Sequence, residues 1–234
     1  MKIGIKYWQR LGDVIRLFPL AKHFSDQGHE VEILCAINYH EIFECVDYVK
    51  PTLCVKHCDI VHDLEIWNSF GSGSDQMRYA DFRTSKKKWT DFIYDDFPDV
   101  EDRRNIQLTK TCFHDADYDL PSEYNLIAPF GMSQVHRWDI NQIIKEAQLA
   151  LIEKGNDLPT LILGQGVEGA LNAKKLYHLP KIIKDATDFF CINSAPSIIA
   201  GAVRCVQYHH FSEPSFDFQD DHENPFQIKH KPTL

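Results

Sequence analysis

The chain has 234 residues, of which 44% are hydrophobic and 25% are charged, and its formal net charge is −9. It is long enough to bury a core as one large or two small domains, and no apolar run approaches the roughly 20 residues that cross a membrane. The negative charge excludes a global basic field for nucleic acid, so a polyanionic partner would need a local basic patch.

The first half of the chain alternates strand and helix patterns up to an acidic, aperiodic stretch at 112–124. The opening strand, IGIKY, precedes a helix predicted from Asp13 to Gln27, which ends at Gly28. The other elements predicted here are a strand at 31–36, a helix at 39–46, a strand at 52–55 and a helix at 75–97. The composition of the stretch 112–124 is typical of a linker.

A second alternation follows this linker. Its predicted strands are 125–130, 160–164, 189–193 and 205–209, and its predicted helices are 139–154, 167–176 and 197–203. Such alternation predicts parallel sheets covered on both faces, with right-handed crossovers. We therefore expect an α/β protein of two Rossmann-like domains facing a cleft, 1–115 and 116–234, with a C-terminal tail able to pack back on the first domain.

The seven cysteines are odd in number and scattered, which favours buried free thiols in a reducing cytosol over a disulfide framework. The start of the chain lacks the features of a secretory signal, so a cytoplasmic location is expected. Cys54, His57 and Cys58 are spaced like a metal clip, but no second cluster completes four ligands in the sequence. A role without metal is therefore the preferred interpretation of this group.

Four segments stand out in order: IGIKYWQRLGDVIRLFPLAKHF, GHEVEILC, IAPFGMSQVHRWDINQIIKEA and LPKIIKDATDFFCINSAPSIIAGAV. Together they resemble a compact, bacteriophage-type member of the heptosyltransferase-like, GT9-type glycosyltransferases, which have the two-domain GT-B fold. The resemblance covers most of 1–36 and 124–206. It implies an enzyme that moves a sugar from a nucleotide-diphosphate sugar to an acceptor hydroxyl.

Gly12 and Asp13 follow the first strand, where parallel sheets present their ligands. A carboxylate there can act as the general base that removes the proton of an acceptor hydroxyl, and Gly12 allows a tight turn. From spacing alone, Asp13 is better interpreted as the N-cap of its helix. The resemblance reverses that preference and makes Asp13 the catalytic base.

The residues 193–195 open a helix after an apolar strand, and a helix N-terminus suits a diphosphate, although an ordinary cap explains them equally well. Arg137 beside Trp138 suits neutralisation of the departing diphosphate; the alternative is a surface arginine before a helix capped by Asp139. The resemblance adds contacts to base and ribose after the strand at 160–164. The predicted donor-binding set is Arg137, Trp138, Gly164, Gln165, Glu168, Asn193, Ser194, Ala195 and Ser197, with His136 as a weaker candidate.

One local concentration of positive charge lies in the first half of the chain, and a solvated helix face is its ordinary explanation. The sharper hypothesis is an anionic acceptor, with Trp89 or Tyr79 stacking on a displaced base if that acceptor is DNA. A phosphorylated lipopolysaccharide core and a hydroxylated pyrimidine in DNA fit about equally. The predicted acceptor-binding residues are Lys86, Lys87, Lys88, Trp89, Arg103 and Arg104.

Two acidic groups resemble metal sites, one from Asp115 to Asp119 and one from Asp217 to Glu223, but both are typical of solvated segments. We therefore expect no metal and no cofactor besides the nucleotide sugar. A catalytically silent binding module is the alternative, because Ile198 stands where the family usually has His. A dinucleotide-dependent enzyme is disfavoured, since no G-x-G-x-x-G follows the first strand.

Overall fold

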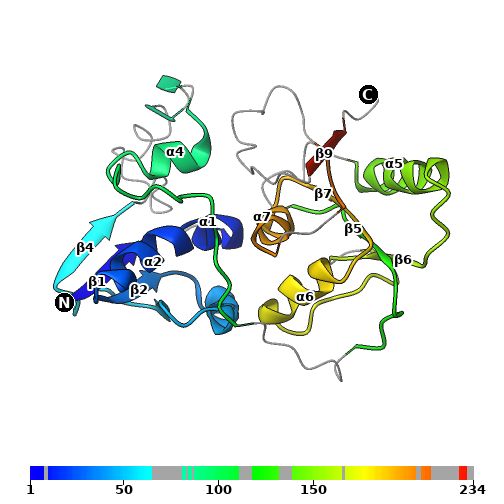
Figure 1. The fold of residues 1–234 in the computed structure, drawn as a ribbon. Coiled ribbons are helices and arrows are strands. Elements are labelled where there is room, and N and C mark those ends of the chain that lie inside the picture. Colours follow the sequence, from blue (N-terminus) through cyan, green and yellow to red (C-terminus); the bar gives the residue numbers. More distant parts are fainter. Residues whose placement is uncertain are drawn as a thin grey trace. The chain divides into compact units, whose positions relative to one another are not determined.

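The computed structural model describes residues 1–7, 10–64, 81–82, 84–85, 87–110, 118–131, 139–164, 167–203, 207–211 and 227–230. The chain divides into two compact units, the first containing Met1–Lys110 and the second most of the remaining chain. Each unit has its own parallel sheet (Figure 1). None of the helices in the described ranges is both long and apolar enough to traverse a lipid bilayer.

The first unit has a four-stranded sheet in the order β3-β2-β1-β4. Its strands are β1 (Lys2–Lys6), β2 (Glu30–Leu34), β3 (Lys50–Thr52) and β4 (Ile60–Asp63). Its helices are α1 (Leu11–Arg16), α2 (Phe18–Asp26), the 3-10 helix η1 (Ile37–Cys45) and α4 (Trp89–Ile93). The chain runs from β1 through β2 to β3 on one side, and β4 joins β1 on the other. The switch point of this sheet therefore lies between the carboxyl ends of β1 and β4.

The two faces of this sheet differ. The buried residues of one face are Ile3, Ile5, Val31 and Ile33. His62 of β4 pairs with Ile5 and therefore lies on the same face. Phe24 of α2 stacks on His62, which shows that α2 packs on this face. The opposite face carries Gly4 and Glu32, and a Cβ on Gly4 would lie 2.8 Å from Cβ of Val55. In the described part of this face, a loop thus takes the place of the covering helix that the alternation predicted.

The single helix predicted from Asp13 to Gln27 is two helices separated at Leu17. Pro19 lies in the first turn of α2, where a missing N–H costs nothing, so the sequence favours a new helix start there. The Tyr94 hydroxyl bridges the break: it donates to the carbonyl of Arg16 at 2.7 Å and accepts from the N–H of Leu20 at 3.1 Å. The segment after α4 is thereby fastened to the α1–α2 junction.

The second unit has a five-stranded sheet in the order β6-β5-β7-β8-β9. Its strands are β5 (Asn125–Ala128), β6 (Thr160–Ile162), β7 (Asp188–Ile192), β8 (Tyr208–Phe211) and β9 (Gln227–His230). Its helices are α5 (Ile140–Glu153), the 3-10 helix η3 (Leu176–His178), α6 (Leu179–Lys184) and α7 (Ala195–Ala202). Because β6 and β7 lie on opposite sides of β5, this sheet also has a switch point, between β5 and β7.

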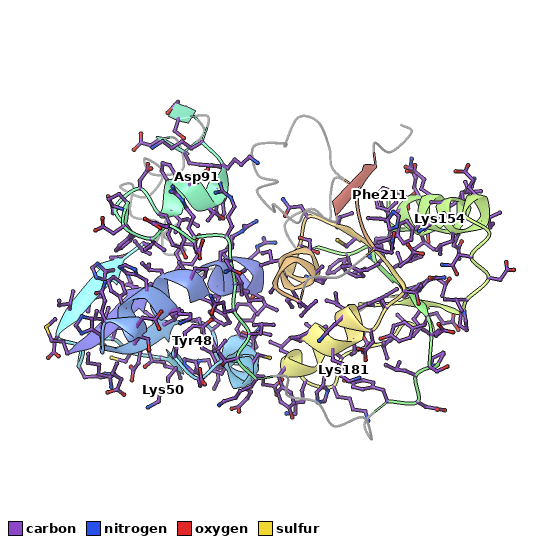
Figure 2. All side chains as sticks on the ribbon, in the orientation of Figure 1. Tyr48, Lys50, Asp91, Lys154, Lys181 and Phe211 are labelled. Carbon is purple, nitrogen blue, oxygen red and sulfur yellow. The ribbon has the colours of Figure 1, made fainter. Side chains whose placement is uncertain are left out.

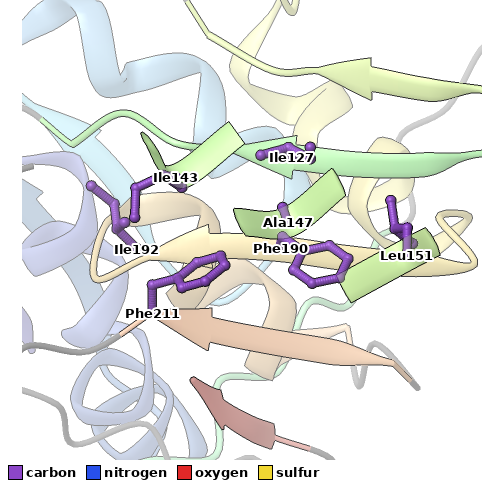
Figure 3. Packing of buried hydrophobic residues seen from close by; sticks show 7 residues of the cluster. All are labelled: Ile127, Ile143, Ala147, Leu151, Phe190, Ile192 and Phe211. Carbon is purple, nitrogen blue, oxygen red and sulfur yellow. The ribbon is translucent and has the colours of Figure 1, made fainter. Parts of the chain in front are cut away.

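The core of the second unit forms where α5 packs on the sheet (Figure 3). Ile143, Ala147 and Leu151 recur every four residues along α5 and are buried. The sheet residues of this cluster are Ile127, Phe190, Ile192 and Phe211. The helix begins after Asp139, whose carboxylate accepts the N–H of Asn141 at 2.9 Å, so the predicted cap is confirmed.

Several predicted elements differ from the structure. The helix predicted at 167–176 is wrong: residues 167–170 form a bend and a turn, and the first helical residue in this region is Leu176. Strands β4 and β9 were not predicted. The helix predicted at 39–46 is a 3-10 helix.

Candidate functional site

Asp13 lies just beyond the carboxyl end of β1, at the switch point of the first sheet. Helix α1 begins at Leu11 with Arg10 as its N-cap, so Asp13 lies inside the first turn. The alternative interpretation, in which Asp13 is only a helix N-cap, is therefore wrong. Gly12, which precedes it, is buried within the same turn.

The Asp13 carboxylate is held by two donors from different parts of the unit. Its Oδ1 accepts the indole N–H of Trp89 at 2.9 Å and a guanidinium N–H of Arg16 at 3.2 Å. The Arg16 charge stabilises an ionised carboxylate, and two bonds to one oxygen fix its orientation. The Asp13 side chain is 20% exposed, so it remains open to a solute.

Trp89 is positioned by the packing around α4. It is 8% exposed, and its ring meets the ring of Phe82 edge to face, with centroids 4.5 Å apart. Trp89, which was predicted to contact the acceptor, lies against Asp13 and has little exposed surface for stacking. The contacts of Trp89 with Asp13 and of Tyr94 with Arg16 carried no signal in the sequence, because each joins residues more than 70 positions apart. Arg16 lies only three positions after Asp13, but the sequence analysis did not select it.

The predicted acceptor patch is a mixed-charge surface in its described part. Lys87 contacts Asp95 at 2.6 Å, and Arg104 contacts Asp91 of α4 at 2.6 Å (Figure 2). Arg103 reaches the other oxygen of that Asp91 carboxylate at 3.5 Å. Lys88 is the half-buried N-cap residue of α4.

In the second unit, Asn193 and Ser194 connect β7 to α7 at the switch point. Ser197 shapes this turn: its hydroxyl accepts the N–H of Ser194 at 3.1 Å and donates to the carbonyl of Ser194 at 2.6 Å. The Ser194 hydroxyl donates to the carbonyl of Ile192 at 3.0 Å. Ser197 was predicted to contact the donor. Because it is fully buried, it would affect donor binding by fixing the shape of the turn. Ala195 is the first residue of α7.

Gly131, which was not predicted as a site residue, lies where the chain after β5 packs against the Asn193–Ser194 turn. A Cβ on Gly131 would lie 3.2 Å from Cβ of Ser194 and 3.3 Å from the carbonyl oxygen of Asn193. The only signal was a glycine shortly after the strand at 125–128. Gly164 follows β6 with φ +136° and adjoins Phe130, so three turns meet at the carboxyl edge of this sheet.

One further residue of the predicted donor-binding set lies within the described ranges. Glu168 is exposed in a turn, because the helix predicted at 167–176 is absent. The residues outside the described ranges are Tyr79, Lys86, Asp115, Asp117, His136, Arg137, Trp138, Gln165 and 217–223.

The sequence matches no protein-family model and no curated protein. The structure is similar to TibC from enterotoxigenic E. coli H10407, a bacterial iron-containing dodecameric glycosyltransferase, with a TM-score of 0.64 and 16% identity. The match covers 99% of this chain and 65% of TibC. A glycosyl transferase family 9 protein from Veillonella parvula DSM 2008 gives a TM-score of 0.64 at 11% identity, over 98% of this chain and 85% of that protein.

The E. coli heptosyltransferase WaaC, solved with ADP, gives a TM-score of 0.60 at 10% identity, over 98% of this chain and 92% of WaaC. The chain therefore has the α/β GT-B fold of the heptosyltransferases, as the resemblance implied. It spans about two thirds of the length of TibC.

The expectation that no metal takes part is contradicted. TibC is described as iron-containing, and the first unit of this chain brings together Glu32, His57 and Cys58, whose ligand atoms lie within 4.8 Å of one another. The sequence grouped His57 with two cysteines but missed Glu32. That residue comes from the middle of β2, 25 positions before His57.

Proposed function

We propose that this chain is a glycosyltransferase that moves a sugar from a nucleotide-diphosphate sugar to an acceptor hydroxyl. The observation that carries the proposal is the placement of two segments. The Gly12–Asp13 segment and the Asn193–Ser194 turn each lie at the switch point of a parallel sheet, where such sheets bind ligands. The GT-B fold of the heptosyltransferases supports the same conclusion.

In this proposal Asp13 is the general base. The acceptor O–H proton passes to the Asp13 carboxylate while the acceptor oxygen attacks the anomeric carbon. The bond from that carbon to the phosphate oxygen breaks, and its electron pair leaves with the nucleoside diphosphate. The hydrogen bonds from Trp89 and Arg16 hold the carboxylate in a fixed orientation before the acceptor arrives.

The donor diphosphate is assigned to the turn before α7. Gly131 lets the chain after β5 pack closely against this turn at the carboxyl edge of the sheet, where phosphates can approach main-chain N–H groups. We assign to Arg137 the charge that stabilises the leaving diphosphate. Since WaaC was solved with ADP and TibC with ADP-D-beta-D-heptose, an ADP-heptose-type donor is the first to test.

A glycan of the lipopolysaccharide core is the preferred acceptor. A structural neighbour is the E. coli ADP-heptose LPS heptosyltransferase II, matched at a TM-score of 0.60 and 11% identity. The ion pairs of Lys87, Arg103 and Arg104 with carboxylates leave a mixed surface, which suits a sugar carrying few phosphates better than a DNA backbone.

The test compares wild type with Asp13→Asn and with Asp26→Asn, an exposed acid on α2 paired with Lys22. Thermal shift against ADP-, UDP-, GDP- and CMP-sugars identifies the donor, since binding to the folded state raises the melting temperature. We expect Asp13→Asn to bind the donor but to lose transfer, by about 10²–10⁴-fold, and Asp26→Asn to remain active. Equal turnover by Asp13→Asn would remove the base assignment, and donor binding without transfer in wild type would favour the silent module.

A further inference from the structure

A cluster of metal-ligating side chains lies away from Asp13. His57 and Cys58 precede β4, whereas Asp13 follows β1, and the two strands pair in parallel. The cluster therefore lies on a face of the sheet, whereas the proposed catalytic base lies beyond the carboxyl end of β1. It belongs to the face that the loop at 53–59 covers.

Glu32 is the buried centre of this cluster, 8% exposed in the middle of β2. Its Oε1 accepts from Lys2 Nζ at 2.7 Å, and its Oε2 lies 2.8 Å from Nε2 of His57. Burial by itself would raise the pKa of Glu32, but the bonds from Lys2 and His57 outweigh it and lower this pKa. One carboxylate oxygen of Glu32 is thus paired with Lys2, and the other lies beside the His57 imidazole.

Cys58 completes the cluster because Gly4 makes room for it. A Cβ on Gly4 would lie 3.0 Å from the Cys58 sulfur and 2.8 Å from Cβ of Val55. Any side chain on this position of β1 would therefore displace the loop that carries His57 and Cys58. The glycine holds the thiol close to the sheet, next to Glu32.

We propose that Glu32, His57 and Cys58 form a binding site for a divalent transition-metal ion of the zinc or ferrous class. One carboxylate, one imidazole and one thiolate are a donor set that such ions accept. On a tetrahedral ion with ligand bonds of about 2.0–2.3 Å, neighbouring ligand atoms lie about 3.3–3.7 Å apart. The present spread, within 4.8 Å, comes close to that arrangement.

The ion clips the 53–59 loop to β2. Without it, two hydrogen bonds between Asp59 and Lys2 hold this loop to β1, and the contact of His57 with Glu32 holds it to β2. The His57 side chain is 48% exposed, so it can rotate onto the ion, and solvent supplies the remaining ligand. A thiol must lose its proton to bind a metal ion, so binding should release protons and grow stronger with rising pH.

The test is titration of the chelator-treated, reduced full-length chain with Co²⁺, whose bond to a thiolate gives a near-ultraviolet charge-transfer band. We expect one equivalent of Co²⁺ to develop this band and Zn²⁺ to displace it, following the order of divalent affinities. Cys58→Ser should abolish the band. Cys54→Ser is the matched control, because it removes an exposed thiol of the same loop outside the triad, and it should keep the band.

Two further variants guard against misfolding as an explanation. His57→Ala changes a half-exposed side chain, and Glu32→Gln keeps the shape of the glutamate side chain. Both variants should lower the affinity for Co²⁺ by at least about 10–100-fold. Zn²⁺ should raise the melting temperature of wild type but not of His57→Ala, whose circular dichroism without metal should match wild type. A band that persists in Cys58→Ser, or no band in wild type at saturating Co²⁺, would overturn the proposal. Sugar transfer is not part of the readout.

Discussion

Trp89 donates its indole N–H to the carboxylate of Asp13 at 2.9 Å, although the two residues are 76 positions apart in the sequence. This bond makes the orientation of the proposed base depend on α4 and on the packing of Trp89 against Phe82. Tyr94, five residues beyond Trp89, fastens the same segment to the α1–α2 break. The first unit thus holds Asp13 through contacts from a distant part of the chain.

Trp89→Phe tests whether this bond serves catalysis. Phenylalanine keeps the ring contact with Phe82 but removes the N–H donor to Asp13. We expect about 1 kcal/mol lower stability from the lost hydrogen bond, unchanged donor binding, and a fall in kcat measured with saturating donor and acceptor. Phe92→Leu, which alters the other ring contact of Phe82, is the matched control for packing. A kcat equal to wild type would limit Trp89 to a structural role.

Gly131→Ala tests the proposed donor turn. The new Cβ would lie 3.2 Å from Cβ of Ser194 and 3.3 Å from the Asn193 carbonyl, so the two turns must separate by a few tenths of an ångström. We expect weaker donor binding in calorimetry and a stability loss of about 1–3 kcal/mol. Gly201→Ala is the control: nothing lies within 4 Å of its Cβ, and an alanine in α7 should stabilise the helix by roughly 0.5–1 kcal/mol. Donor affinity that both variants share with wild type would place the diphosphate elsewhere.

Local patterns predicted the parts of the fold that depend on local signals. The apolar spacing of α5 and the cap at Asp139 depend on a stretch of 15 residues, and the structure has both features. The helix predicted at 167–176 fails because Leu171 instead donates its N–H to Ile162 of β6 at 2.7 Å, and Gly169 adopts φ +71°. The positions of Asp13 and Ser194 after their strands followed from the alternation of strands and helices alone. The contacts of Trp89 with Asp13, of Gly131 with Ser194 and of Glu32 with His57 join distant parts of the chain, so no local pattern predicts them.

Asp188 gives the second unit a predictable acid sensitivity. This buried carboxylate at the start of β7 accepts from Lys154 at 2.5 Å, His209 at 2.8 Å and Asn156 at 2.8 Å. Burial alone would raise its pKa, but these hydrogen bonds outweigh that effect and lower the pKa below the ordinary 3.8. Because the pKa is lower in the folded state, the stabilisation is present above 3.8 and is lost as pH falls through that value and below.

Urea unfolding from pH 7 to pH 3 measures this contribution. Asp188→Asn should be less stable at pH 7, by about 1–3 kcal/mol, because the charge-assisted bonds are lost. Its stability should also fall less than that of wild type between pH 5 and pH 3. The control is Asp185→Asn, which removes the exposed i,i+4 partner of Lys181 and should follow the wild-type profile. Parallel profiles for wild type and Asp188→Asn would show that other carboxylates dominate the acid transition.

A test of the predicted acceptor-binding residues needs variants that leave the neighbouring carboxylates paired with a positive charge. Reversing Lys87 or Arg104 would place a second negative charge next to that of Asp95 or Asp91, so loss of stability would obscure the result. Lys88→Gln combined with Arg103→Gln leaves the two short ion pairs intact. We expect this double variant to raise KM for an anionic acceptor while donor binding stays the same. Lys50→Gln, on an exposed lysine of β3, is the matched control and should leave KM unchanged.

The salt dependence of acceptor binding distinguishes the two acceptor classes. A lipopolysaccharide core with one or two phosphates releases few counterions, so its affinity should fall only shallowly with salt. A DNA acceptor would give a slope of about −0.9 per neutralised phosphate in a log–log plot. We expect transfer to the heptose-deficient core with the shallow slope, and none to DNA that carries hydroxylated pyrimidines. Transfer to that DNA with a steep slope, weakened in the double variant, would reverse the assignment of the acceptor while leaving Asp13 as the base.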